Sequence, residues 1–169
     1  MKELTQDRVK YLFDYKDGFL IRAVDKHTAK KGDVIKGCLT GKGYKTGKGY
    51  LSARVDNKLI QLHRVIFLWH HGYLPKYIDH INNINTDNRI ENLRECTASE
   101  NMANKPATSA NTTGFKGVYF RKDIKKYGAE VTFNKKTYFL GLFLNAEDAA
   151  DAAKNKRVEI HKEFNNDTI

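Results

Sequence analysis

Cysteine, proline and long apolar runs are scarce in this chain, which has two cysteines and two prolines in 169 residues. Cys38 and Cys96 stand far apart and form no CxxC pair, so the sequence suggests neither a disulfide framework nor a zinc knuckle. No apolar run approaches the roughly 20 residues that a membrane-spanning helix needs. We therefore expect a soluble, intracellular protein of the cytoplasm with reduced thiols, no membrane partner and no disulfide-linked partner.

Acidic residues are also in short supply: 20 Asp and Glu stand against 30 Lys and Arg, which gives a formal net charge of +10. The hydrophobic fraction of 40% supplies enough material for one ordinary domain or two small ones. A basic surface attracts a polyanion, because each Lys or Arg placed on a phosphate releases condensed counterions. Nucleic acid is the first partner to consider, although a basic surface can also serve solubility alone.

The first third of the chain alternates short apolar pieces with glycine-containing turns. This alternation predicts short strands and hairpins from Met1 to about Gln61. The stretch at 37–50 is rich in lysine and glycine, and its lysines could follow a phosphate backbone or lie on a solvated loop. Its candidates for phosphate contacts are Lys42, Lys45 and Lys48. The run that follows, HRVIFLWHHG, predicts a short buried helix that ends at Gly72.

The stretch from Lys76 to Lys105 is dense in asparagine and acidic residues. Residues 77–81 and 92–97 are typical of two strands, joined by a loop without helical length or periodicity. Thr97 and Glu100 match a capping box, which predicts that a helix begins there. Two strands and a helix would bring these polar side chains into one small unit: Asp79, His80, Asn92, Asn101 and Asn104.

These residue types suit the hydrolysis of a phosphodiester bond. His80, with an ordinary pKa of about 6.5, could accept a proton from water at neutral pH. Asp79 and Asn101 supply oxygen ligands of the kind that Mg²⁺ prefers, with waters and a phosphate oxygen completing its coordination. The first hypothesis for this unit is therefore a metal-dependent nuclease site.

Five motifs, in order and spacing, make the region from about Leu12 to Lys105 resemble the HNH, or ββα-metal, nucleases of intron-encoded and phage homing endonucleases. The motifs are His63-Arg64, Gly72 to Pro75, Ile78 to His80, Asp87 to Arg94, and Ala98 to Lys105. The resemblance implies a DNA endonuclease with Asp79 and Asn101 as metal ligands. It also implies that His80 is the general base and that Asn92 braces the loop and orients the histidine. Asn101 stands where the family's motif ends in histidine, which favours Mg²⁺, with Mn²⁺ as a substitute, over zinc.

Other polar residues of this region have plainer interpretations. The remaining loop residues are expected only to shape the loop through their own backbone: Asn82, Asn83, Asn85, Asp87 and Asn88. A structural role is the preferred interpretation for four histidines: His63, His70, His71 and His161. Three arginines could hold phosphate oxygens or pair with Glu91 or Glu95: Arg64, Arg89 and Arg94.

A polar stretch with Pro106 and no apolar periodicity predicts a linker at 106–113. After it, three β-rich runs and an alanine-rich segment with Asn145 as N-cap predict a three-stranded antiparallel sheet backed by one helix. Alternation along the strands turns these residues toward the helix: Val118, Phe120, Ala129, Val131, Phe133, Tyr138 and Leu140.

The segment from Gly114 to Phe164 resembles the plant-type Apetala/ethylene-response-factor DNA-binding domain. The landmarks are Gly117-Val118, Arg121, Tyr127 to Val131, Phe139 to Phe143, and Asn145 to Ala153. The resemblance implies that the sheet lies in the major groove of double-stranded DNA. The expected contacts are Tyr119, Arg121, Lys122, Lys126, Glu130, Thr132, Lys136, Thr137 and Phe139. Base preference cannot be transferred, because several arginines and a tryptophan usual in that family are replaced by Tyr119, Thr132 and Thr137.

The sequence therefore predicts an α+β protein with two modules. Residues 1–105 would hold β-hairpins that lead into a ββα-metal HNH unit with its core at about 76–105, and residues 114–169 would form the DNA-reading sheet and helix. We expect a homing-type endonuclease that nicks one DNA strand per active site, as a monomer or a DNA-bound dimer, in the cytoplasm of a phage-infected host if it is phage-encoded. The alternatives are a catalytically silent DNA-binding regulator that retains the fold and a protein directed at RNA.

Overall fold

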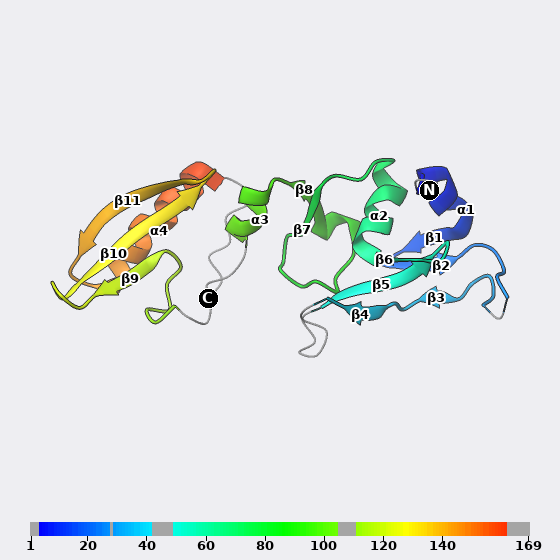
Figure 1. Cartoon of the computed structure of the whole chain (residues 1–169), viewed down its shortest axis with the longest axis horizontal. Coiled ribbons are helices and arrows are strands. Elements are labelled where there is room, and N and C mark those ends of the chain that lie inside the picture. Colours follow the sequence, from blue (N-terminus) through cyan, green and yellow to red (C-terminus); the bar gives the residue numbers. More distant parts are fainter. Residues whose placement is uncertain (1–3, 28, 42–48, 105–110, 162–169) are drawn as a thin grey trace. The chain divides into compact units, whose positions relative to one another are not determined.

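The computed structural model describes residues 4–27, 29–41, 49–104 and 111–161 (Figure 1). The described part of the chain contains small antiparallel sheets together with helices, which confirms the predicted α+β class. Its contacts form two compact units, Met1–Cys96 and Thr97–Ile169. The predicted phosphate contacts Lys42, Lys45 and Lys48 lie outside the described residues, as do positions 106–110 of the predicted linker.

The first unit contains two three-stranded sheets and one two-stranded sheet in its described residues, with strand orders β1-β2-β3, β4-β5-β6 and β7-β8. Its strands are β1 (Phe13–Lys16), β2 (Phe19–Arg22), β3 (Val34–Ile35), β4 (Cys38–Thr40), β5 (Tyr50–Val55), β6 (Lys58–Gln61), β7 (Tyr77–His80) and β8 (Leu93–Cys96). Its helices are α1 (Gln6–Leu12), α2 (Leu62–His71) and the short 3-10 helix η2 (Ile90–Asn92).

Helix α1 corrects the prediction that strands begin at Met1. The Thr5 side chain accepts a hydrogen bond from the backbone N–H of Arg8 at 3.3 Å and caps the helix. Val9 and Leu12 lie three residues apart, hence on one side of the helix, and both are buried. The cap and this apolar face favour a helix, and the extended alternation begins only at Phe13.

Helix α2 is the centre of the first unit. Its buried residues join a core that includes α1, β1, β2, β5, β7 and β8, so the N-terminal elements and the β7-β8 pair share one apolar interior. The helix ends at Gly72, whose φ of 80° is left-handed and whose N–H donates to the Leu68 carbonyl at 3.0 Å. The predicted buried helix and its glycine C-cap are confirmed. None of the helices in the described ranges is long and apolar enough to cross a membrane.

The second unit contains α3 (Ala98–Asn104), β9 (Val118–Arg121), β10 (Lys126–Phe133), β11 (Lys136–Phe143) and α4 (Ala146–His161). The strands form one antiparallel sheet in the order β11-β10-β9, and α4 packs on one face of it (Figure 1). Ala149 and Ala153 are fully buried, and these small side chains let the helix approach the sheet closely. The predicted sheet and helix are confirmed. Phe120, predicted to face the helix, is 42% exposed and packs instead beside the ring of Tyr127.

Two glycines of the second unit allow the cost of a left-handed backbone to be compared with the cost of a steric clash. Gly114 and Gly117 both have positive φ, but a Cβ at Gly117 would lie 2.5 Å from the Glu130 carbonyl oxygen, whereas one at Gly114 would meet nothing within 4 Å. Gly114→Ala should cost about 1 kcal/mol for the left-handed backbone, and Gly117→Ala at least about twice as much. Urea denaturation followed by far-UV circular dichroism measures both; equal losses would contradict the close contact.

Candidate active site

Strands β7 and β8 position the first two predicted site residues. Their antiparallel register pairs Asp79 with Arg94 and His80 with Leu93. Asp79 and His80 are only 5% and 4% exposed. Successive residues of a strand point to opposite faces, so these two neighbours meet different partners.

Asp79 forms a buried ion pair with Arg94. The Nε and a terminal nitrogen of Arg94 donate to Oδ2 of Asp79 at 3.0 and 2.9 Å. The sequence did not predict Asp79 as the partner of Arg94. The expected acidic partners were Glu91 and Glu95. Of the other two arginines, Arg89 pairs with Asp87 and Arg64 donates to the carbonyl oxygen of Pro75.

His80 is held by Asn88. Its Nε2 lies 3.1 Å from Oδ1 of Asn88, and both side chains are buried. Because an amide oxygen accepts, Nε2 is the protonated nitrogen and Nδ1 carries the lone pair. Burial lowers the pKa of His80, while the Asn88 hydrogen bond and the charges of Asp79 and Asp87 act in the opposite direction. The histidine is therefore neutral at neutral pH, which is the form that can accept a proton.

Asn92 ties the two ends of the loop between β7 and β8. Its Nδ2 donates to Oδ1 of Asn82 at 3.0 Å and to the carbonyl oxygen of Asp87 at 2.8 Å, and its Oδ1 accepts from the Asn82 N–H at 3.0 Å. These bonds brace the loop. The hydrogen bond to His80 Nε2 comes from Asn88, which we expected only to shape the loop. Nothing in the sequence pattern distinguishes Asn88 from the neighbouring asparagines.

Aromatic rings surround His80 on another side. Tyr50 begins β5 and His63 lies in the first turn of α2. Ring centroids are 5.1 Å apart for His63 and His80, 5.1 Å for Tyr50 and His63, and 5.9 Å for Tyr50 and His80. Burial, reinforced by His80 and Arg64, lowers the pKa of His63 to about 3. His63 therefore stays neutral and packs against His80 without adding a charge.

The N-terminal hairpin supports the same loop from a distant part of the chain. The Tyr15 hydroxyl accepts from the Ile90 N–H at 3.0 Å. At the β1-β2 turn, Gly18 has a φ of +86°, and a Cβ there would lie 2.9 Å from the backbone nitrogen of Arg89. The hairpin thus packs directly against the segment that follows Asn88, and so helps to position it.

Asn101 lies on α3, in the second unit. The predicted capping box is present: the Thr97 N–H donates to Glu100 Oε2 at 2.7 Å, and the Glu100 N–H donates to Thr97 Oγ1 at 3.2 Å. Asn101 is half-buried and its N–H donates to the Thr97 carbonyl. The helix is attached to the second unit at both ends, through Ser99 and Ala103, as described below.

Comparison with known families gave a match that covers the β7-β8 region. Residues 61–103 match the family described as HNH endonuclease. The matched segment contains all four residues predicted for the nuclease site: Asp79, His80, Asn92 and Asn101. No curated protein and no solved structure gave a significant match. The family match indicates a nuclease that hydrolyses DNA, and HNH nucleases generally depend on a divalent metal.

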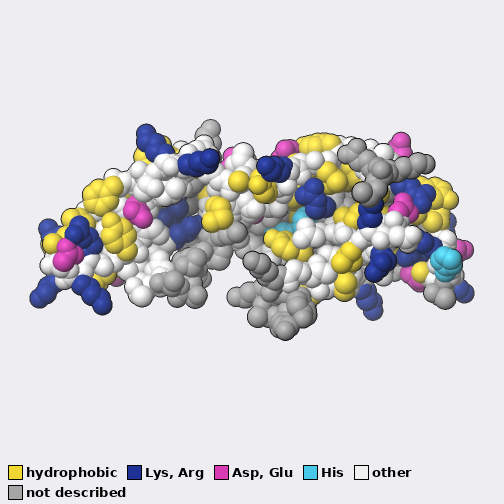
Figure 2. All heavy atoms as spheres, in the orientation of Figure 1, with side chains coloured by type: hydrophobic (Ala, Val, Ile, Leu, Met, Phe, Trp, Pro, Cys, Tyr) yellow, Lys and Arg dark blue, Asp and Glu magenta, His cyan; other side chains and the backbone are white. Residues whose placement is uncertain are grey.

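Several of the predicted DNA contacts of the second unit lie on the face of the sheet that α4 leaves uncovered. Lys136 does not, because its Nζ lies over the ring of Tyr138, which Lys156 of α4 also contacts. The register pairs Thr132 with Thr137, whose hydroxyls are 2.9 Å apart, and Glu130 with Phe139, which is 60% exposed. Tyr119 lies over Gly128, where a Cβ would be 2.5 Å from the ring. Of the remaining predicted contacts, Lys126 is half-buried, and the other three are exposed: Arg121, Lys122 and Lys136. Lys and Arg side chains gather at the tip of this unit (left in Figure 2).

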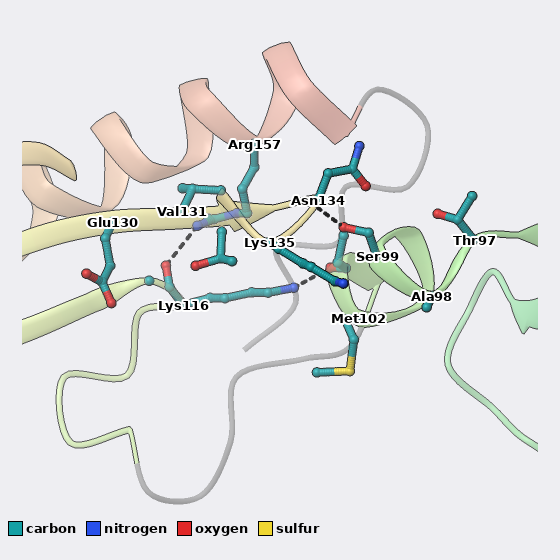
Figure 3. Close-up of a pocket in the computed structure, with 13 residues that line it drawn as sticks. Thr97, Ala98, Ser99, Met102, Lys116, Glu130, Val131, Asn134, Lys135 and Arg157 are labelled. Carbon is teal, nitrogen blue, oxygen red and sulfur yellow. Dashed lines mark hydrogen bonds between the residues drawn. The ribbon is translucent and has the colours of Figure 1, made fainter. Parts of the chain in front are cut away.

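A pocket of about 840 Å³ lies beside this sheet (Figure 3). All of its lining residues belong to the second unit, and they include Glu130 and Thr132. Lys116 crosses it to donate to the Ala103 carbonyl of α3, and the buried Arg157 donates to the Lys116 carbonyl at 2.8 Å. Ser99 Oγ accepts from the N–H of Asn134, also a lining residue, at 2.9 Å. These hydrogen bonds attach α3 to the sheet and the loops of the second unit.

Proposed function

We propose that this chain is a sequence-directed, homing-type DNA endonuclease of the HNH type that nicks one strand per active site. The observation that carries the proposal is the buried His80, hydrogen-bonded to Asn88 and adjacent to Asp79 within the segment that matches the HNH family. A histidine in this state is suited to accept a proton from a water molecule that attacks a phosphate.

The candidate metal ligands suit a hard cation. No group of three His, Cys, Asp or Glu residues that could hold a metal occurs in the described ranges. Asp79 offers carboxylate oxygens, and Mg²⁺ commonly takes only one or two protein oxygens beside waters and substrate phosphate. This donor set fits Mg²⁺ or Mn²⁺ better than zinc, which prefers nitrogen and sulfur. When bound, such an ion would offset the charge that develops on the phosphate and the leaving oxygen.

The chain's own residues would divide the remaining work. His80 accepts the proton at Nδ1, because Asn88 engages Nε2. Asn92 keeps the loop closed, so that Asn88 stays in place. The outer face of the β9-β10-β11 sheet reads the DNA: Thr132 and Thr137 can meet thymine methyl groups, and Arg121 can reach a base edge or a phosphate.

A catalytically silent DNA-binding regulator is the second candidate. The Arg94–Asp79 ion pair favours it, because the pair satisfies the buried carboxylate without any metal ion. The two candidates differ in cleavage and agree in DNA binding, so a cleavage assay separates them.

Supercoiled plasmid is the substrate for that assay, with Mg²⁺ or with EDTA, and products are resolved on an agarose gel. We expect nicked circles to appear in Mg²⁺ and to be absent in EDTA. Linear product without a nicked intermediate would contradict single-strand cutting. Absence of cleavage in Mg²⁺ and Mn²⁺, on DNA that the protein binds, would establish the regulator instead.

A further inference from the structure

Arg94 holds the carboxylate that the proposed mechanism needs for its metal ion. The β7-β8 register makes Arg94 and Asp79 direct partners, so the backbone itself brings the guanidinium to the carboxylate. Only 15% of the Arg94 side chain and 6% of the Asp79 side chain are exposed. A pair this far from solvent is weakly screened by salt, so the positive charge acts strongly on anything that approaches Asp79.

The neighbouring arginines are placed differently. Arg89 engages both carboxylate oxygens of Asp87 and is 53% exposed. Arg64 donates to a backbone carbonyl oxygen. Of these three arginines, Arg94 is the one paired with an expected metal ligand, and it competes with any cation for that ligand.

We propose that Arg94 couples metal binding to DNA binding by exchanging Asp79 for a DNA phosphate, an inference that rests on the proposed nuclease function. Without DNA, the guanidinium neutralises Asp79 and the protein binds divalent ions weakly. With DNA bound, a phosphate gives the guanidinium a second anion of matching geometry. Asp79 can then accept the ion, and by linkage the ion and the DNA each strengthen the binding of the other. The device would restrict metal loading to the DNA-bound protein.

The size of the effect follows from the charge. The guanidinium of Arg94 lies 2.9 Å from Oδ2 of Asp79, so its positive charge repels a cation that approaches this carboxylate. The repulsion is doubled for a divalent cation, because Coulomb energy scales with the product of the charges. Removing the Arg94 charge should therefore increase the affinity of the DNA-free protein for Mn²⁺ by at least about tenfold.

The test measures Mn²⁺ binding to the full-length protein without DNA, by titration calorimetry at neutral pH. Arg94→Gln removes the charge and keeps an amide donor, and we expect it to bind Mn²⁺ at least about tenfold more tightly than the wild type. Arg89→Gln is the matched control: it removes the same charge from the same unit, but from Asp87, and should not change the affinity. Arg94→Lys keeps a positive charge and should stay near the wild type. Adding Asp79→Asn to Arg94→Gln should abolish the gain, which would locate the ion at Asp79.

The Arg94→Gln protein could fail to fold, because the substitution leaves the buried Asp79 carboxylate without its cation. A second measurement therefore uses a protein that keeps Arg94. In the His80→Ala protein, Mn²⁺ should tighten the binding of a fluorescent DNA duplex by about tenfold relative to EDTA, measured by anisotropy. Equal DNA affinity in the two conditions would overturn the coupling. So would an Arg94→Gln protein that binds Mn²⁺ no better than the wild type, or an equal gain in Arg89→Gln.

Plasmid nicking by the wild type is scored separately from these affinities. If the wild type nicks in Mg²⁺ and Arg94→Gln shows no gain in Mn²⁺ affinity, the coupling is wrong and the nuclease stands. If the wild type cuts in neither Mg²⁺ nor Mn²⁺, the proposed function itself fails.

Discussion

Replacing His80 with alanine should reduce the rate of plasmid nicking by about 10²–10⁴-fold, the range that a positioned general base contributes. The reason is the state of the imidazole: it is buried, neutral and held through Nε2 by Asn88, so that Nδ1 can take the proton of the attacking water. DNA binding should stay unchanged, because His80 is buried and is not among the predicted DNA contacts. Initial nicking rates in Mg²⁺ and a gel-shift titration measure the two properties on one protein preparation.

His71→Ala is the matched control for this experiment. It removes the same residue type from the same unit, but His71 is exposed and its ring packs against Phe67 and Tyr73 rather than against site residues. We expect this variant to nick at the wild-type rate. If His80→Ala nicks as fast as His71→Ala, His80 is not the general base of the reaction.

Local signals made much of the fold predictable. The Gly72 C-cap, the Thr97–Glu100 capping box and the Asn145 N-cap each depend on contacts between residues within four positions, so the sequence displays them directly. Helix α1 was missed although Thr5 and Asp7 are ordinary helix-start residues. The period-two alternation starts at Phe13, and the prediction wrongly extended it back over α1. The buried apolar residues of that helix are three residues apart, not two.

The contacts that define the candidate site were less visible in the sequence. Arg94 and Asp79 are 15 positions apart, and Tyr15 and Ile90 are 75 apart. Contacts over such separations depend on strand register and on the packing of whole elements. The spacing of residue types along the sequence predicts neither. The identities of Asp79 and His80 could be predicted from a motif, but the partners that set their charge and orientation could not.

Asn88 illustrates the same limit within a single loop. The loop contains several asparagines, and side-chain direction there depends on individual backbone angles, such as the φ of 59° at Asn83. One of them, Asn88, is 3% exposed and faces His80, while Asn82 and Asn92 hydrogen-bond to each other. Composition alone assigns all of them to loop shaping, and only the folded backbone singles out the one that contacts the histidine.

Asn88→Ala should therefore reduce the turnover number for nicking by about 10–100-fold, as loss of an orienting partner typically does. Without the amide oxygen, Nε2 of His80 loses the acceptor that orients the ring and favours one tautomer, so the lone pair spends less time at Nδ1. The KM for DNA should change little, because Asn88 is buried and the proposed reading surface lies elsewhere. Steady-state nicking at varied plasmid concentration separates the two constants.

Two further substitutions distinguish orientation from packing at this position. Asn88→Asp keeps an oxygen that can accept from Nε2 and should retain most of the turnover. Asn88→Leu has similar volume but no acceptor, so it should lose as much turnover as Asn88→Ala even if its melting temperature equals that of the wild type. If the leucine variant nicks like the wild type, the hydrogen bond at 3.1 Å is incidental to catalysis, and the tautomer of His80 is set by other contacts.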